Sequence, residues 1–290
     1  MAANPFATSI ITGINVVVEG FPTFGNLELE ETVHAEPIFH SGGGGGADRA
    51  AGNIDFRGRI IAWGHTPPTF PGDTFDLSFT INGGDHVLSN SVETDLNTTV
   101  RCMGLDIIVP VEDPQQQNAV YYIVEFGAAG YGLSYGVDSA PTDTVAPRIY
   151  PVQGLTCLLD DEEEDNVTEM RLSIKNMTEP ALNSGTNGVF YRARGNLDWQ
   201  FTYSRHINEL SLLPDKNSVK SIEMQVEAAV GTTAALSWLA SYGRVMGPKI
   251  MLDRKTRRPI SAEITLEMCT NGTKVGEVSD PTITQKWPFS

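Results

Sequence analysis

The sequence has few cysteines, few basic residues and no long apolar run. Its three cysteines, Cys102, Cys157 and Cys269, are an odd number in a chain of 290 residues. That argues against a disulfide framework, so we expect reduced, buried thiols. No apolar stretch approaches the roughly 18 residues that a membrane-spanning helix needs, so we expect no membrane partner. The first residues, MAANPFATSI, lack a basic stretch followed by an apolar run, so we expect no secretory signal.

Positive charge is the second scarcity. The chain has 20 Lys and Arg against 36 Asp and Glu, which gives a net charge of −16. Tight binding to nucleic acid requires Lys and Arg clustered on the phosphates, so the composition argues against it. An acidic surface that nucleic acid passes without adhering remains compatible with this charge.

Catalytic and ligand-binding motifs occur only as fragments without their context. GLSYG (132–136) matches a hydrolase nucleophile elbow, but the following VDSAPTDTVAP cannot start the helix that the elbow needs. The five glycines at 42–46 lack the Lys-Ser/Thr and the helix of a phosphate loop. The histidines show no metal-ligand spacing, and the acidic run at 160–165 lacks the central glycine of a calcium loop. We therefore expect no enzyme, no catalytic residue, no metal and no cofactor.

What the sequence does contain is a near-copy of itself. Residues 49–56 read RAAGNIDF and residues 192–199 read RARGNLDW, an offset of 192 − 49 = 143. The match continues without a gap from Glu36, which falls on Glu179, to Pro71, which falls on Pro214. Because the offset is close to half the chain length, we interpret the match as an internal duplication.

The duplication predicts two tandem domains, residues 1–145 and 146–290. A linker is expected at about 140–160, since APTDTVAPRIYPVQG (140–154) has linker composition. The 28 glycines and 17 prolines favour many turns and therefore β-structure. We predict a mainly all-β chain of two β-sandwich or barrel domains, with at most one or two short helices.

The repeated stretch alternates as a half-buried strand does. Its glycine predicts a bulge or a close backbone approach at the start of the strand. Arg192 and Asp198 lie too far apart along one strand to pair, so we expect their partners on other strands or another subunit. Ile54, Phe56, Leu197 and Trp199 are expected inside, and Asn53, Asp55, Asn196 and Asp198 on the opposite face. The candidate structural residues of the repeat are Gly52, Asn53, Asp55 and Phe56 in the first copy, and Gly195, Asn196, Asp198 and Trp199 in the second.

Other segments also carry strand or helix signals. A Thr cap, spaced apolar residues and a final glycine predict a helix at TTAALSWLASYG (232–243). Apolar and β-branched runs between Pro and Gly clusters predict strands. These are residues 14–20, 27–33, 77–81, 105–111, 120–126, 170–174, 222–228, 260–268 and 282–287.

The stretch LSIKNMTEPALNSGTNGVFYRARGNLDWQFTYS (172–204), with its weaker copy at 29–62, resembles β-barrel proteins of tailed bacteriophage virions. Among these it is most similar to the tail tube protein family of long-tailed phages. The resemblance implies a structural virion protein whose rings stack into a hollow tail tube. It would be assembled in the host bacterial cytoplasm, with other tail proteins as partners. DNA would pass through the lumen without specific binding, for which an acidic lining is suited.

The resemblance also implies a particular symmetry. Rings of this family are six-fold and use single-barrel subunits, so a chain with two barrels would fill a ring with three copies. Such a ring would have three-fold and approximate six-fold symmetry, with alternating contacts within and between chains.

Two alternatives stay open from the sequence. One is another β-barrel part of the virion, namely a decoration, tail terminator or baseplate protein. The other is a carbohydrate- or ligand-binding pair of β-sandwiches, with Tyr131, Tyr135 or Trp238 as an exposed platform. The opposed charge clusters at 160–165 and 253–259 are either two solvated turns or partners across a subunit contact.

Overall fold

The structure is a computed structural model. It describes residues 16–18, 24–39, 48–49, 52–63, 69–81, 94–110, 119–129, 134–136, 154–182, 190–227, 236–252, 259–269 and 284–286.

These residues form β-strands and a single 3₁₀ helix, Leu210–Leu212. The first strands are β1 (Val16–Val18), β2 (Phe24–His34), β3 (Pro37–Ile38), β4 (Asp48–Arg49), β5 (Asn53–Trp63), β6 (Thr74–Ile81), β7 (Thr94–Pro110), β8 (Tyr121–Ala128) and β9 (Ser134–Gly136). The others are β10 (Gly154–Leu159), β11 (Glu162–Glu163), β12 (Val167–Met177), β13 (Asn196–His206), β14 (Val219–Glu227), β15 (Leu236–Val245), β16 (Lys249–Met251), β17 (Ser261–Met268) and β18 (Thr284–Lys286).

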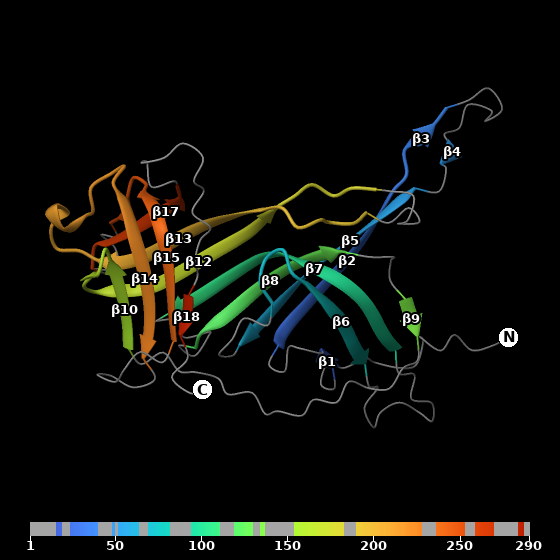
Figure 1. Cartoon of the computed structure of the whole chain (residues 1–290), viewed down its shortest axis with the longest axis horizontal. Helices are drawn as coiled ribbons and strands as arrows, with labels where there is room; N and C mark the ends of the chain where they lie inside the picture. The colour runs from blue at the N-terminus through green and yellow to red at the C-terminus, as the bar shows by residue number, and fades with distance from the viewer. Residues whose placement is uncertain are drawn as a thin grey trace.

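Sixteen of the strands form one antiparallel sheet, so the predicted mainly β fold is confirmed. The main order is β11-β10-β14-β15-β17-β13-β12-β7-β8-β5-β2, with the remaining strands attached at its sides (Figure 1). β3 and β4 form a separate two-stranded sheet that projects from the ends of β2 and β5. Each of the nine additional segments predicted as strands overlaps a strand.

The helix predicted at 232–243 is wrong, because residues 236–245 form β15. This strand pairs with β14 on one side and with β17 and β18 on the other. Trp238 and Ala240 are both buried, so alternate residues face the core as in a strand. Ladder hydrogen bonds and this burial outweigh the local helix propensity of the Ala- and Leu-rich segment.

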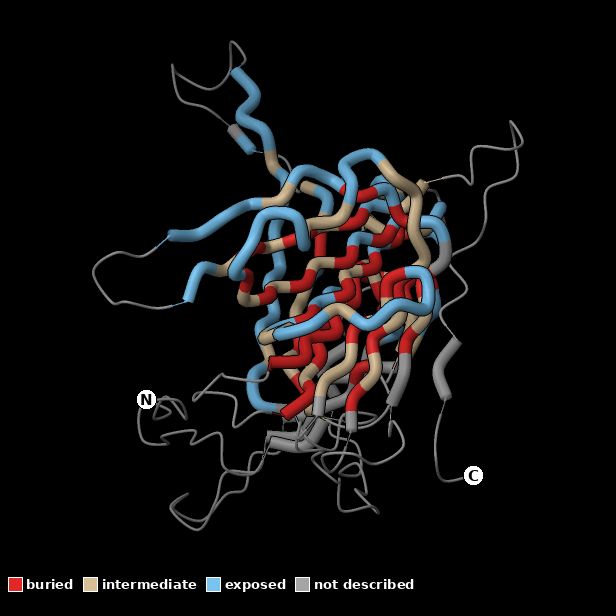
Figure 2. The backbone as a smooth tube through the Cα atoms, turned by 90° about the vertical axis from the view of Figure 1, so that its left-hand side faces the viewer, coloured by how far each residue is buried: buried red, intermediate tan, exposed pale blue. Residues whose placement is uncertain are grey.

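Apolar side chains from both halves of the sheet form one continuous core. The alternation is clearest in β12 and β13, where every second residue is buried. Figure 2 shows the buried positions running through the strands, with exposed arms extending beyond them. The large sheet therefore presents an apolar face to the core and a polar face outward.

Two hairpins of the sheet share the same length and register. β2 and β12 begin at residues 24 and 167, β5 and β13 at 53 and 196, and both differences are 143. Leu29 lies opposite Gly58, and Leu172 lies opposite Phe201, again 143 further along. Both hairpins also shift register near their first residues, at Phe24 and Val167.

The strand order around these hairpins also recurs. One set runs β1-β6-β7-β8-β5-β2 and the other β10-β14-β15-β17-β13-β12. β9 attaches to β7 as β18 attaches to β15. The sets meet where β12 pairs with the second half of β7, from Gly104 to Pro110. Of the expected linker at 140–160, the structure describes β10 and Asp160.

Candidate functional site

The glycine shared by the repeats lies directly before β5 and β13, close to the end of the neighbouring strand. A Cβ on Gly52 would lie 2.0 Å from the carbonyl oxygen of His34. A Cβ on Gly195 would lie 2.2 Å from that of Met177. Only glycine fits at either position without movement of the backbone, which is the close approach that the sequence predicts.

The apolar positions of the repeat lie as alternation predicts. Phe56 and Trp199 are fully buried in the core. Ile54 and Leu197 are partly buried. On the other face, Asn53, Asn196 and Asp198 are exposed.

Asp55 differs from its counterpart Asp198, because Asp55 is buried although it lies on the face of the strand opposite to Phe56. Its carboxylate is buried because Arg192 covers it, and both side chains are 4% exposed. Nη2 of Arg192 donates to Oδ1 and Oδ2 of Asp55 at 2.7 and 2.8 Å. Nε of Arg57 donates to Oδ2 at 2.7 Å. The partner of Arg192 is therefore the aspartate of the other repeat.

The backbone of Arg192 is also bound to the first set of strands. Its N–H donates to the carbonyl of Ala128 at 3.0 Å, and Nε of Arg101 donates to its carbonyl oxygen at 2.6 Å. Gly127 leaves room for the guanidinium, since a Cβ there would lie 2.5 Å from Nη1. The segment that connects β12 and β13 is thus fixed across β5 and β8.

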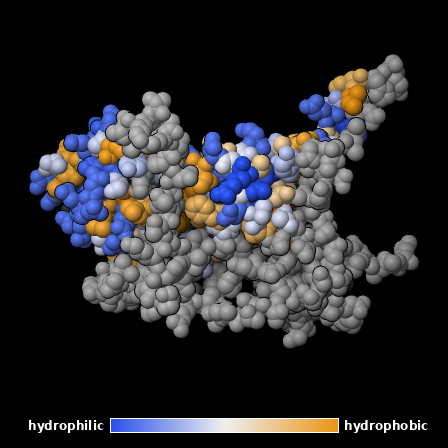
Figure 3. Space-filling model, in the orientation of Figure 1, coloured by the Kyte–Doolittle hydropathy of each residue, from blue (hydrophilic) through white to orange (hydrophobic). Residues whose placement is uncertain are grey.

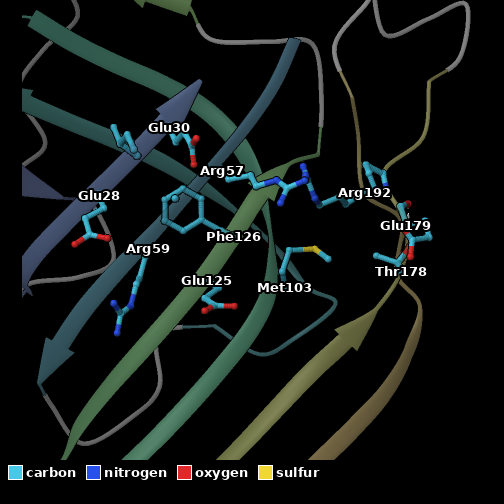
Figure 4. A pocket seen from close by; sticks show the side chains of 13 residues that line it. Glu28, Glu30, Arg57, Arg59, Met103, Glu125, Phe126, Thr178, Glu179 and Arg192 are labelled. Carbon is cyan, nitrogen blue, oxygen red and sulfur yellow. Dashed lines mark hydrogen bonds between the residues drawn. The ribbon is translucent and has the colours of Figure 1, made fainter. Parts of the chain in front are cut away.

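A pocket of about 490 Å³ lies where this segment crosses the first set of strands. Figure 4 shows Thr178, Glu179 and Arg192 on one side and residues of β2, β5 and β8 on the other. Four glutamates and three arginines line it, namely Glu28, Glu30, Glu125, Glu179, Arg57, Arg59 and Arg192. Such balanced charge is more typical of a contact between two polar surfaces than of a small-molecule site, which is mostly apolar.

In the second set of strands, none of the described segments covers the corresponding place. A hollow of about 240 Å³ lies there, beside Asp198, Trp199, Glu267 and Met268. Ser173, Lys175 and Gln200 complete its lining. Two carboxylates face one lysine here, so the hollow carries a negative surplus.

Among the described residues, β2 and β16 are two of the strands that leave one edge open. β2 ends the main order and pairs only with β5, and β16 pairs only with β17. Unpaired edges present free N–H and C=O groups to another chain.

Exposed large apolar side chains gather near the same two edges. One group is on β2 and the projecting arm, and the other is on and beside β16. The first is Leu29, Val33, Ile38 and Phe39, and the second is Met246, Ile250, Met251, Leu252 and Ile260. Figure 3 shows hydrophobic residues on the arm that projects away from the body. Apolar surface at an open edge is typical of an interaction site.

Two residues of the acidic run at 160–165 form ion pairs within the chain. Glu164 forms an ion pair with Arg205, which is buried. Lys220 Nζ lies 2.8 Å from Asp160 Oδ2. Partial burial raises the pKa of Asp160, but hydrogen bonds from Lys220 and Ser221 outweigh it and hold that pKa below its usual value. Residues 253–258, from the basic cluster, lie outside the described residues.

Several other sequence-based candidates lie within the described residues. Cys102 and Cys157 are buried free thiols as expected, whereas Cys269 is only partly buried. Trp238 is 1% exposed, so it cannot serve as an exposed aromatic platform. Ser134 of the GLSYG stretch lies in β9, a strand and not the turn of a nucleophile elbow. Tyr131 lies outside the described residues.

Sequence reasoning missed Arg101, Gly127 and the two open edges. Arg101 has a counterpart 143 residues on, Arg244, whose Nη1 donates to the carbonyl of Asn217 at 3.0 Å. Arg101 likewise donates through Nη1 to the carbonyl of Gly72. The same offset, extended beyond residue 71, would have found this pair. The edges carry no such signal, because pairing is a property of the folded sheet.

Within the described ranges, no three His, Cys, Asp or Glu side chains lie together as metal ligands. No helix in those ranges is long and apolar enough to cross a membrane. No protein-family model matches the chain, and no curated protein matches it.

Proposed function

We propose that this chain is a structural, non-enzymatic virion protein, a tail tube subunit built from two tandem β domains that arose by duplication. Three chains would close a ring of approximate six-fold symmetry, and the rings would stack into a conduit for DNA. Other tail proteins would be its further partners. The proposal joins the resemblance of residues 29–62 and 172–204 to the geometry of the sheet.

The observation that carries the proposal is the way the two sets of strands are joined. Two sets with the same strand order lie side by side in one sheet, through the β12–β7 pairing. Such a head-to-tail contact joins two different surfaces, so it can repeat until a ring closes. Among the described residues, the strands that correspond to β12 and to the second half of β7, namely β2 and β16, each keep an edge open to further copies.

The charge of the sheet supports the conduit. Asp106, Glu125, Glu169 and Glu263 line one hollow of about 500 Å³ on the polar face, together with Arg171 and Lys175. With the chain at −16, a lumen formed by this face would repel phosphate and let DNA slide. We assign the part of the polar face around this hollow, on β7, β8, β12, β13 and β17, to the lumen.

Electron microscopy of the purified protein at rising concentration tests the proposal. We expect rings and stacked tubes with three full-length chains per ring. Rings of six chains would overturn the proposed symmetry. A protein that stays monomeric and binds glycans would instead support the ligand-binding alternative. Rings or caps that never stack would favour another virion part.

A further inference from the structure

We propose that neighbouring chains meet through a second copy of the β12–β7 junction, with β2 of one chain paired to β16 of the next. Arg49, the counterpart of Arg192 in the first repeat, then lies against the neighbouring chain. The proposed occupant of both open edges is a second copy of this chain. The proposal rests on the proposed function only in that the chain assembles with itself.

The correspondence between β16 and the second half of β7 follows from the registers. In the first set of strands Ile107 lies opposite Tyr122, and in the second Ile250 lies opposite Ala262. Ile250 is 250 − 107 = 143 residues after Ile107. β16 therefore occupies the position in the second set that the paired half of β7 occupies in the first. The edge of β7 that binds β12 corresponds to the open edge of β16.

The register of the new contact is given by the existing one. On β12 and β7, Leu172 lies opposite Ile107 and Ser173 lies opposite Asp106. We subtract 143 from the β12 residue and add 143 to the β7 residue of each pair. This gives the pairs Leu27–Leu252, Glu28–Met251, Leu29–Ile250 and Glu30–Lys249 between chains.

The side chains that meet in this register suit one another. Leu172 and Ile107, the reference pair, are 0% and 1% exposed. Leu29 and Ile250 are 38% and 40% exposed in the single chain, so pairing would bury them in the same way. Glu30 and Lys249 are opposite in charge, and opposite charges directly across a strand pair are favourable.

The projecting arm completes the contact. In the second set, Ala181 and Tyr191 bridge the two sides of the connecting segment, and in the first set Ile38 and Asp48 do so, each 143 residues earlier. The segment between β12 and β13 lies across the sheet of its own chain, whereas the β3–β4 arm extends away from that sheet (Figure 1). We infer that the β3–β4 arm crosses the neighbouring chain.

Arg49 on this arm would enter the hollow beside Asp198. Arg49 is exposed and donates to the carbonyl of Ala35 at 3.0 Å in the single chain. The residue that corresponds to Gly127 in the second set is Glu267, since Arg57–Gly127 and Gln200–Glu267 are corresponding pairs. A side chain therefore stands where Gly127 leaves room for Arg192. Arg49 therefore cannot repeat the path of Arg192, and meets the carboxylates of Asp198 and Glu267 instead. Arg49 would offset one of these two negative charges, and Lys175, which lines the same hollow, would offset the other.

Disulfide trapping tests the strand pairing. Leu29→Cys and Ile250→Cys are combined in a Cys269→Ser background, where the remaining thiols are the buried Cys102 and Cys157. Five strands lie between β2 and β17, so the two new cysteines lie more than about 20 Å apart in one chain. Mild oxidation should then give chain-to-chain bonds, seen as dimers and closed trimers under denaturing conditions.

A matched control uses the neighbouring position. Leu29→Cys with Met251→Cys places the thiols on opposite faces of the paired strands, so it should give little product. Ring formation is followed in parallel by microscopy. Rings without cross-links would overturn this contact and leave the proposed function standing, whereas cross-linked trimers without tubes would support the contact and overturn the tube. A chain that never associates would overturn both.

Charge reversal tests the arm. Arg49→Glu or Asp198→Arg alone should weaken association by about tenfold or more, and the double variant should restore much of it. Lys216→Glu, on an exposed turn, makes the same charge change away from both surfaces and should have little effect. Equal loss in all three single variants, or no rescue in the double, would show that Arg49 and Asp198 do not meet.

Discussion

The surroundings of Asp55 and Asp198 are built from the same elements and end in opposite states. Each aspartate is the third residue of a strand of eleven residues that begins after a glycine, and it stands next to a buried aromatic residue. Asp55 is closed off by Arg192 and held by two arginines. Asp198 remains exposed beside an open hollow. The strands are alike, so the difference comes from what lies across them.

This difference shows that local sequence decides which face a residue is on, and the connecting segment decides whether that face is covered. The segment after β12 lies on the first set of strands because β12 itself pairs with β7 of that set. The described part of the chain contains no third set of strands for the segment after β2 to reach. An assembly of identical chains would supply one, and the following predictions compare the two places.

The largest effect is expected at the residue that the two places share, the buried aromatic. Trp199→Ala and Phe56→Ala should each lower the free energy of unfolding by about 3–5 kcal/mol, because each removes a buried ring from the common core. Urea denaturation followed by circular dichroism measures both. Trp199→Phe keeps a ring in place and should cost less than Trp199→Ala.

The rate of thiol labelling shows which set of strands each substitution destabilises. Burial raises the pKa of Cys102 to about 12 and also raises the pKa of Cys157, so both thiols react slowly in the folded chain. Cys102 lies in the first set of strands and Cys157 in the second. If Trp199→Ala leaves both labelling and stability unchanged, the face assignment of β13 is wrong.

The next effect separates the two aspartates. Asp55→Ala leaves Arg192 buried without its carboxylate, which should cost about 3 kcal/mol or more. Asp198→Ala, an exposed change in the isolated chain, should stay within about 0.5 kcal/mol. The same urea experiment at a concentration below assembly compares them directly. Similar losses in the two variants would mean that the covered and open states are not distinct.

A smaller effect tests whether the two strand starts are equivalent. Gly52→Ala and Gly195→Ala each place a methyl group within about 2 Å of a backbone carbonyl. Both chains must shift locally, and the cost of such overpacking is about 1–3 kcal/mol. We expect similar losses at the two sites. A loss at only one glycine would contradict the common geometry of the two hairpins.

The sequence predicted the strands well because their signals are local. Alternation in residues 196–206 fixed the faces of β13, and the glycine at 195 indicated the close approach. The prediction of a helix at 232–243 was wrong because local propensity carries no information about pairing with neighbouring strands. The burial of Asp55 also could not be predicted, because the residue that covers it, Arg192, is 137 positions away in the sequence. The open edges are likewise visible only once the sheet order is known.

The smallest effect contrasts the two ends of the sheet. At one end the turn after β10 is held by Lys220 and Asp160, and at the other β2 has no such cover among the described residues. The pKa of Asp160 is lowered, so its contribution is present above the unfolded value near pH 4 and is lost as the pH falls through the folded value. The pKa of Lys220 is raised, chiefly by its hydrogen bond with Asp160, so its contribution is present below the unfolded value and is lost at high pH. Since Asp160 is 43% exposed, Asp160→Asn should cost less than about 1 kcal/mol at neutral pH, and this cost should disappear once the pH lies below the folded pKa of Asp160. Asparagine keeps the positive φ of 54° at this turn, and Asp161→Asn is the matched control beside it. Denaturation curves from pH 2 to pH 8 measure the difference, and a cost that persists unchanged at pH 2 would show that the ion pair is not its source.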